Sequence, residues 1–203
     1  FYIQNWDRLY HGTVTMSTAL SWSYNIPAVR AFETVGYERS KHFAEKIGIP
    51  VTKDEPTTAI GGNVDGVSPT QMAGAFASFG NKGYYNKPST IVKIFNANGK
   101  ELPNIKNEPV KAMSEETAYL ITNVLKGVLT SNGISPNGKI DNFDMAGKSG
   151  SSTFDDSAYY NFGIDVVNST KDSWMIGYTS EYTVSVWQGA DVVDSAAKAL
   201  SSN

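Results

Sequence analysis

The chain has 203 residues, of which 17 are Lys or Arg and 20 are Asp or Glu, with a net charge of −3 and a hydrophobic share of 40%. This composition is typical of one globular domain with a buried core, and its acidic balance lacks the basic surface that attracts nucleic acid. Because the chain has no cysteine and only two histidines, His11 and His42, we expect chemistry based on Ser, Thr, Lys, Tyr and carboxylates, with no metal and no cofactor.

The first part of the chain predicts helices. Apolar residues recur at helical spacing from Thr13 to about Ile49, in two segments that flank residues 23–26, and the second segment is entered at Pro27. Ser68-Pro69 is typical of an N-cap followed by the first helical position. The helix that follows is expected to bury Met72, Ala73, Phe76 and Phe79.

The middle of the chain predicts a hairpin and a further helix. Residues 88–96 alternate like a strand up to the turn signal Asn98-Gly99, and Glu101-Leu102 forms the return. Ser114 is the expected N-cap of a helix that runs through Val128 and ends in a loop over residues 131–138.

The last third predicts strands at residues 144–152, 173–179 and 182–188. After Asp191, the spacing of four apolar residues favours a short helix lying on that sheet: Val193, Ala196, Ala197 and Leu200. The sequence therefore predicts an α+β fold over residues 1–203, with helices packed on an antiparallel sheet.

Residues 148–152, Lys-Ser-Gly-Ser-Ser, form the first candidate site. A lysine on a strand beside a cleft supplies a cation, the hydroxyls donate hydrogen bonds to an anionic group, and Gly150 lets a ligand backbone approach the strand edge. The alternative is an ordinary strand with a small-residue bulge.

Ser23-Tyr24-Asn25 is the second candidate, because a tight link between two helical segments can aim a hydroxyl and an amide into a cleft. The same Ser-x-Asn form occurs at residues 135–137, in a Pro/Gly loop, and at residues 201–203, at the terminus. In the alternative interpretation, Asn25 caps the helix entered at Pro27.

Five ordered blocks carry a family resemblance that covers nearly the whole chain. They are SYNIPAV at 23–29, GVSPTQMA at 66–73 with FGNKGYYNKP at 79–88, TAYL at 117–120, AGKSGS at 146–151, and WMIGYT at 174–179 with VWQG at 186–189. In this order they resemble the transpeptidase domain of class A penicillin-binding proteins. The resemblance implies a serine β-lactamase/transpeptidase-like fold and a serine enzyme that cross-links peptidoglycan stem peptides ending in D-Ala-D-Ala and is acylated by β-lactams.

The resemblance also implies roles for the candidate residues. Ser23 would relay a proton, Asn25 would hold the substrate amide, and Lys148 would keep the potential positive beside the relay. Substrate binding would fall to Ser149, Gly150, Ser151 and Ser152, with the hydroxyls of Ser149 and Ser151 on the terminal carboxylate and the Ser151 N–H in the oxyanion hole. The family more often has Thr at positions 149 and 151, and the loss of its methyl group loosens the hydroxyl rotamer.

The nucleophile of the family is missing from the expected place. The only Ser-x-x-Lys is Ser195 to Lys198, after Lys148, whereas the family places its nucleophile several tens of residues before the Ser-x-Asn, and only 22 residues precede Ser23. We therefore expect Ser195 and Lys198 on the exposed face of a C-terminal helix, and an incomplete domain that is inert without an upstream fragment carrying the nucleophile.

The resemblance implies a longer, membrane-anchored protein that also carries a glycosyltransferase domain and acts on the extracytoplasmic face of the bacterial membrane. The chain itself has no apolar run long enough to span a bilayer. The alternatives are a β-lactamase-like hydrolase, a catalytically inactive penicillin-binding-like sensor, and a binding domain in which the matches are coincidental.

Two further expectations concern aromatic residues. Residues 153–171 form either a cleft-side flap that receives the stem peptide or a surface loop pinned by its own aromatic side chains. The four tryptophans are expected in the core: Trp6, Trp22, Trp174 and Trp187.

Overall fold

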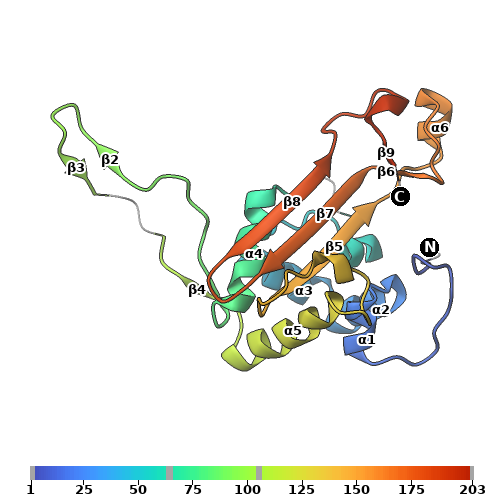
Figure 1. Cartoon of the computed structure of the whole chain (residues 1–203), viewed down its shortest axis with the longest axis horizontal. Coiled ribbons are helices and arrows are strands. Elements are labelled where there is room, and N and C mark those ends of the chain that lie inside the picture. The colour runs from blue at the N-terminus through green and yellow to red at the C-terminus, as the bar shows by residue number, and fades with distance from the viewer. Residues whose placement is uncertain (1–2, 63–65, 104–106, 202–203) are drawn as a thin grey trace.

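A three-stranded antiparallel sheet backed by helices forms the centre of the computed structural model, which describes residues 3–62, 66–103 and 107–201 (Figure 1). The strands are β5 (Ala146–Ser152), β7 (Asp172–Tyr178) and β8 (Thr183–Gly189), in the order β5-β7-β8. In the register, Lys148 lies opposite Ile176 and Trp174 lies opposite Trp187. The predicted α+β fold and its antiparallel strands are confirmed.

The first part of the chain is helical, as predicted, but the second predicted segment is divided at Gly36 into two helices. The elements are α1 (Met16–Ser21), α2 (Asn25–Val35), α3 (Tyr37–Lys46), the 3₁₀ helix η1 (Pro56–Ile60), α4 (Pro69–Gly80) and, later, α5 (Glu115–Val128). Both predicted caps are present: the Ser68 hydroxyl accepts from Gln71 N–H in a capping box, and the Ser114 hydroxyl accepts from Thr117 N–H.

Between α4 and α5, the residues that the structure describes form four two-residue strands. β1 (Tyr84–Tyr85) pairs with β4 (Val110–Lys111), while β2 (Ile94–Phe95) and β3 (Glu101–Leu102) pair in an arm that projects from the body in Figure 1. The strand predicted for residues 88–96 is therefore reduced to two residues. An arm that packs on no larger sheet has no buried face to extend its pairing.

The main core joins α5 to the sheet. Its buried members are Leu125, Val128, Leu129, Ala146 and Tyr178. Phe76 and Phe79 of α4 pack against this cluster half-buried, as does Leu20 of α1, while the fully buried residues of α4 are Gly74, Ala75 and Ser78. Two of the residues predicted for the buried face of α4, Phe76 and Phe79, thus contact the core, but the residues of α4 that are fully buried are its smallest ones.

The predicted C-terminal helix is wrong. After Asp191 the structure has a 3₁₀ turn, η3 (Ala196–Lys198), and then β9 (Leu200–Ser201), which pairs antiparallel with β6 (Ser169–Thr170). A helix this short is marginal in water, so a few backbone hydrogen bonds to a remote segment outweigh the local apolar spacing.

The tryptophan prediction is also corrected. Trp6 is 53% exposed, and its indole N–H donates to the Trp22 carbonyl at 2.8 Å, while the other three tryptophans are half-buried. Trp174 and Trp187 meet across the β7–β8 register with ring centroids 6.3 Å apart.

Candidate active site

Ser23 and Lys148, 125 positions apart in the sequence, are in direct contact. The Lys148 ammonium donates to Ser23 Oγ at 2.6 Å and to the Ser149 carbonyl at 2.6 Å. One side chain comes from the link between α1 and α2, and the other comes from β5. The tertiary structure therefore brings the two sequence motifs into one site.

The backbone of Ser23 is left-handed, with φ 56°. Ser23 N–H bonds to the Leu20 carbonyl at 3.1 Å and Tyr24 N–H bonds to the Ala19 carbonyl at 2.9 Å. This pair of hydrogen bonds is the Schellman ending of α1, with Ser23 at the position that favours glycine. A side chain there costs about 1–2 kcal/mol, so the hydroxyl is held at the expense of backbone strain.

The end of α1 is fixed against α5. The buried Ser21 hydroxyl points at α5, where a Cβ on Gly127 would approach Ser21 Oγ to 2.6 Å, so glycine permits the close approach of the two helices. The Ser21 carbonyl accepts from Ile134 N–H at 3.1 Å. Ser23 therefore projects from a helix end that is held from two sides.

Burial lowers the pKa of Lys148 to about 8. The ammonium is still protonated at neutral pH, and its two hydrogen-bond acceptors are neutral oxygens. Among the residues that the structure describes, the ion pairs do not include Lys148. A desolvated cation with no carboxylate partner presents positive potential to an anionic ligand.

The four residues after Lys148 differ in their surroundings. The Ser149 hydroxyl accepts from the Ser135 hydroxyl at 2.7 Å, while Gly150 and Ser151 are exposed on β5. Ser152 donates to the Asp172 carboxylate, which also accepts from the Trp187 indole at 2.9 Å. The hydroxyl of Ser152 is thus committed to the β5–β7–β8 sheet. Ser149 is half-buried like Ser152, whereas Ser151 is exposed.

Asn25 faces the N-terminal segment. Its amide Nδ2 donates to the Gln4 carbonyl at 2.8 Å. The alternative role of Asn25 as a helix cap is wrong, because α2 already begins at Asn25 and the acceptor for Ile26 N–H is the side chain of Asn5, at 3.1 Å. His11 stacks on Tyr24 with centroids 4.2 Å apart, so the N-terminal segment contacts both Tyr24 and Asn25.

Ser135 and Asp172 are site neighbours that sequence reasoning missed. Ser135 stands in the second Ser-x-Asn, which its Pro/Gly loop context marked as incidental, and Asp172 is one of many surface-type carboxylates. Neither carries a local signal for its contact, because both partners lie on a strand whose position depends on the fold.

Ser195 and Lys198 do not pair with one another. Lys198 donates to the Asp194 carboxylate at 2.8 Å, and Ser195 precedes the 3₁₀ turn η3. The only Ser-x-x-Lys of the sequence therefore lacks the hydrogen bond from lysine to serine that would activate a nucleophile. The third Ser-x-Asn ends at residues 202–203, outside the described residues.

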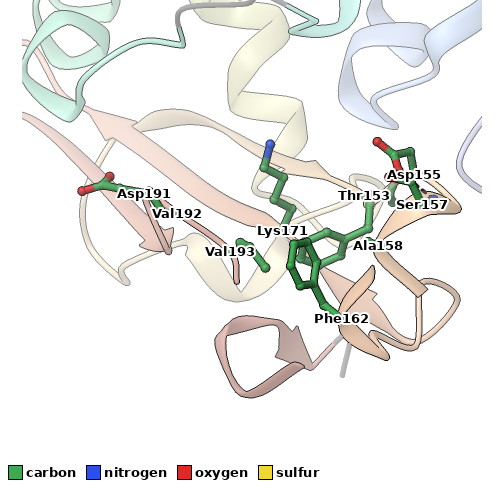
Figure 2. A pocket seen from close by; sticks show the side chains of 10 residues that line it. Thr153, Asp155, Ser157, Ala158, Phe162, Lys171, Asp191, Val192 and Val193 are labelled. Atoms are coloured by element: carbon green, nitrogen blue, oxygen red, sulfur yellow. Dashed lines mark hydrogen bonds between the residues drawn. The ribbon is translucent and has the colours of Figure 1, made fainter. Parts of the chain in front are cut away.

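A cavity of about 360 Å³ lies beyond the end of β5, against the segment 153–171 (Figure 2). Figure 2 shows Asp155 and Asp191 on opposite sides, with Lys171 and Phe162 between them. The segment carries its own helix, α6 (Ser157–Phe162), and is anchored by the buried Ala158 and Ile164. Three of its four aromatic residues are exposed, Tyr159 by 59%, Tyr160 by 82% and Phe162 by 40%, so the aromatic side chains do not all pin the loop.

In the described ranges, 3–62, 66–103 and 107–201, no group of three His, Asp or Glu side chains is arranged to hold a metal ion. Within the same ranges, no helix has the length and hydropathy needed to cross a bilayer.

Comparison with known proteins gives one family. Residues 2–203 match the penicillin-binding protein transpeptidase domain. The chain is 39% identical over 204 residues to penicillin-binding protein 1A/1B of Bacillus subtilis (strain 168), covering 98% of this chain and 22% of that protein. It is 36% identical over 193 residues to penicillin-binding protein 1A of Streptococcus pneumoniae, covering 92% of this chain and 27% of that protein. The chain thus spans about a quarter of the length of these relatives.

Solved structures share the fold. Penicillin-binding protein 1A from Haemophilus influenzae superposes with a TM-score of 0.73 at 22% identity, over 97% of this chain and 34% of that chain. The imipenem acyl-enzyme of penicillin-binding protein A from M. tuberculosis superposes with a TM-score of 0.72 at 17% identity, over 93% of this chain and 47% of that chain.

Proposed function

Since this chain belongs to the penicillin-binding protein transpeptidase family, we propose that the protein of which it forms part is a peptidoglycan D,D-transpeptidase. The observation that carries the proposal is the 2.6 Å hydrogen bond from Lys148 to Ser23, which unites the Ser-x-Asn and Lys-Ser-Gly motifs. The substrate is a stem peptide ending in D-Ala-D-Ala, and β-lactams acylate the same nucleophile.

In the proposed reaction, the Oγ of an upstream serine forms an ester with the penultimate D-Ala carbonyl, and the peptide bond to the last D-Ala breaks. The proton of the attacking hydroxyl passes through Ser23 to the departing amine. An amine of a second stem peptide then attacks the ester, forms the cross-link and returns the proton to the serine. The atoms and charges balance without any cofactor.

Lys148 supports the relay from a fixed position. Its ammonium donates to Ser23 Oγ, so the hydroxyl hydrogen of Ser23 points away from Lys148 and is left for the proposed proton transfer. The positive charge also stabilises the alkoxide-like oxygens that develop during proton transfer, which is worth most in a partly desolvated site.

Substrate binding is proposed for the exposed side of β5. In the described part of the chain, β5 pairs with β7 alone, and a peptide can align along its other edge. Ser149 and Ser151 donate to the terminal carboxylate, Gly150 gives the backbone room, and the Ser151 N–H contributes to the oxyanion hole. Asn25 binds the substrate amide once its own amide turns from the Gln4 carbonyl.

We propose that residues 1–203 are the C-terminal part of the transpeptidase domain and are inactive without the upstream part. Val184 and Val186 of β8 are 59% and 55% exposed on one face of the sheet, as expected for a face that further chain covers. We also propose that the full-length protein carries a glycosyltransferase domain and a membrane anchor, as class A penicillin-binding proteins do. The anchor would hold this domain on the extracytoplasmic face of the membrane.

The test labels the full-length protein with a fluorescent penicillin, digests it and locates the labelled peptide by mass spectrometry. The label is expected on a serine before residue 1, and Lys148→Ala is expected to slow labelling about a hundredfold, as for the loss of an electrostatic catalytic group. A label on a serine within residues 1–203 refutes the upstream nucleophile. An unlabelled full-length protein refutes the function.

Two measurements separate the alternatives. A β-lactamase-like hydrolase releases the penicillin ester quickly, whereas a transpeptidase keeps it for much longer than one labelling cycle. A second assay supplies a stem-peptide donor together with a D-amino acid as acceptor. Transpeptidase activity joins the D-amino acid to the donor, whereas carboxypeptidase activity releases the shortened donor with a free carboxylate. An inactive sensor binds the penicillin without forming an ester.

A further inference from the structure

Ser135 lies in the loop between α5 and β5, immediately before the short 3₁₀ helix η2 (Pro136–Gly138). Its half-buried hydroxyl donates to Ser149 Oγ at 2.7 Å. Its backbone is fixed on both sides, because Ser135 N–H bonds to the Val128 carbonyl at 3.0 Å and the Ser135 carbonyl accepts from Gly138 N–H at 3.1 Å. The donor to Ser149 therefore stands on an ordered backbone.

The same loop touches both halves of the candidate site. Ile134 N–H bonds to the Ser21 carbonyl, two residues before Ser23, while Ser135 reaches β5. Gly138 seats the loop on the sheet, since a Cβ there would meet the Met175 methyl at 2.4 Å. The loop thus sets the position of the Ser135 hydroxyl relative to Ser23 and Lys148 together.

A serine hydroxyl has one hydrogen to donate and turns among three rotamers. When Ser149 Oγ accepts the Ser135 hydrogen, its own hydrogen cannot point back along that bond and is left for another acceptor. Accepting a hydrogen bond also polarises the Ser149 O–H, which makes it a better donor. Position 149 holds Ser, so the methyl group that would restrict a threonine rotamer is absent.

We propose that Ser135 is a positioning residue, which directs the Ser149 hydroxyl at the carboxylate of the stem peptide or β-lactam. The inference rests on the proposed function, because it takes Ser149 as a carboxylate donor. Ser135 contacts no substrate in this scheme. It replaces, through a hydrogen bond, the restriction that a methyl group on residue 149 would give.

The test measures acylation of the full-length protein by a penicillin and by the methyl ester of the same penicillin, which lacks the carboxylate. Ser135→Val and Ser135→Thr have the same shape and differ in the hydroxyl. We expect Ser135→Val to lower the second-order acylation rate constant about threefold to tenfold with the free acid, the effect of one hydrogen bond. Ser135→Thr should retain the wild-type rate, and Ser131→Ala, at an exposed serine of the same loop, is the control.

With the methyl ester, the Val and Thr variants should react at equal rates. In a Ser149→Ala background, the difference between them should also disappear, because the two residues act through one hydroxyl. Equal rates with the free acid overturn the role of Ser135 while leaving the function intact. A difference that persists with the ester, or in the Ser149→Ala background, assigns Ser135 a structural role and overturns the proposal. Failure of the wild-type protein to be acylated overturns the function as well.

Discussion

Replacing Ser23 with alanine and with glycine separates the strain of its backbone from the chemistry of its hydroxyl. Ser23 has φ 56° at the Schellman ending of α1. Alanine keeps the strain of a side chain in this conformation, about 1–2 kcal/mol. Glycine removes that strain, but it also gives the unfolded chain more conformational freedom, which lowers the free energy of unfolding by about 0.4–1 kcal/mol. The Gly variant should therefore be more stable than the Ala variant by about 0.5–1 kcal/mol.

Both variants lose the oxygen that accepts a hydrogen bond from the Lys148 ammonium. The loss of a hydrogen bond to a charged group costs about 1.5–3 kcal/mol in each variant and therefore cancels when the two are compared. Both should also lose penicillin acylation by at least about a hundredfold, as expected for a proton-transfer group. The two variants thus differ in stability and agree in activity.

The assay is thermal unfolding of the full-length protein, followed through the transition of the transpeptidase domain, with acylation rates measured alongside. A difference of this size in stability shifts the midpoint by about 1–4 °C in a domain of about 150–250 residues, and by less in a larger domain. Equal midpoints for the Ala and Gly variants would show that Ser23 carries no backbone strain. Acylation that survives in both variants would remove Ser23 from the proton relay.

Three further predictions follow from the site and its support. Because the pKa of Lys148 is about 8, its charge is lost as the pH rises through that value; acylation should fall above about pH 8, and Lys148→Arg should abolish that limb of the pH profile. A limb unchanged by this substitution assigns the titration to another group. Asp172→Ala leaves the Trp187 indole N–H without its acceptor and should lower the free energy of unfolding by about 1–3 kcal/mol, measured against Asp172→Asn; equal stability of the two variants contradicts the role of the acceptor. Gly83→Ala places a Cβ 2.3 Å from the Met113 carbonyl oxygen at φ +84°, so we expect a lower melting temperature, with Gly99→Ala, at a turn with open space, as the milder control; an unchanged melting temperature for the Gly83 variant contradicts the close packing of that turn.

Some parts of the fold follow from local sequence. The caps at Ser68 and Ser114 are specified within three residues of themselves, because a side-chain oxygen satisfies a nearby backbone N–H. The strands around Trp174 and Val186 contain residues that sheets favour, and their pairing follows from the short connection between them. The ordered family blocks then relate Ser23 and Lys148 to one reaction before their distance is known.

Local sequence does not determine the structure of a segment whose backbone can form hydrogen bonds either with its neighbours or with a remote part of the chain. The segment after Asp191 has helical spacing, yet Leu200 pairs with Thr170, because a remote strand satisfies its backbone better than an isolated short helix can. Asparagine is a residue type that often caps helices, but the oxygen that accepts from the Ile26 N–H at the start of α2 belongs to the side chain of Asn5 and not to Asn25.

The sequence by itself determined which residue types stand in the site: a hydroxyl at Ser23, an ammonium at Lys148 and hydroxyls after it. Only the tertiary structure decided that Lys148 reaches Ser23 across 125 positions and that Ser135 reaches Ser149. The physical reason is the distance along the chain over which each kind of interaction acts. Backbone preferences and caps act within one turn of the chain, whereas the partner of a side chain depends on how whole elements pack, and that packing is a property of the entire chain.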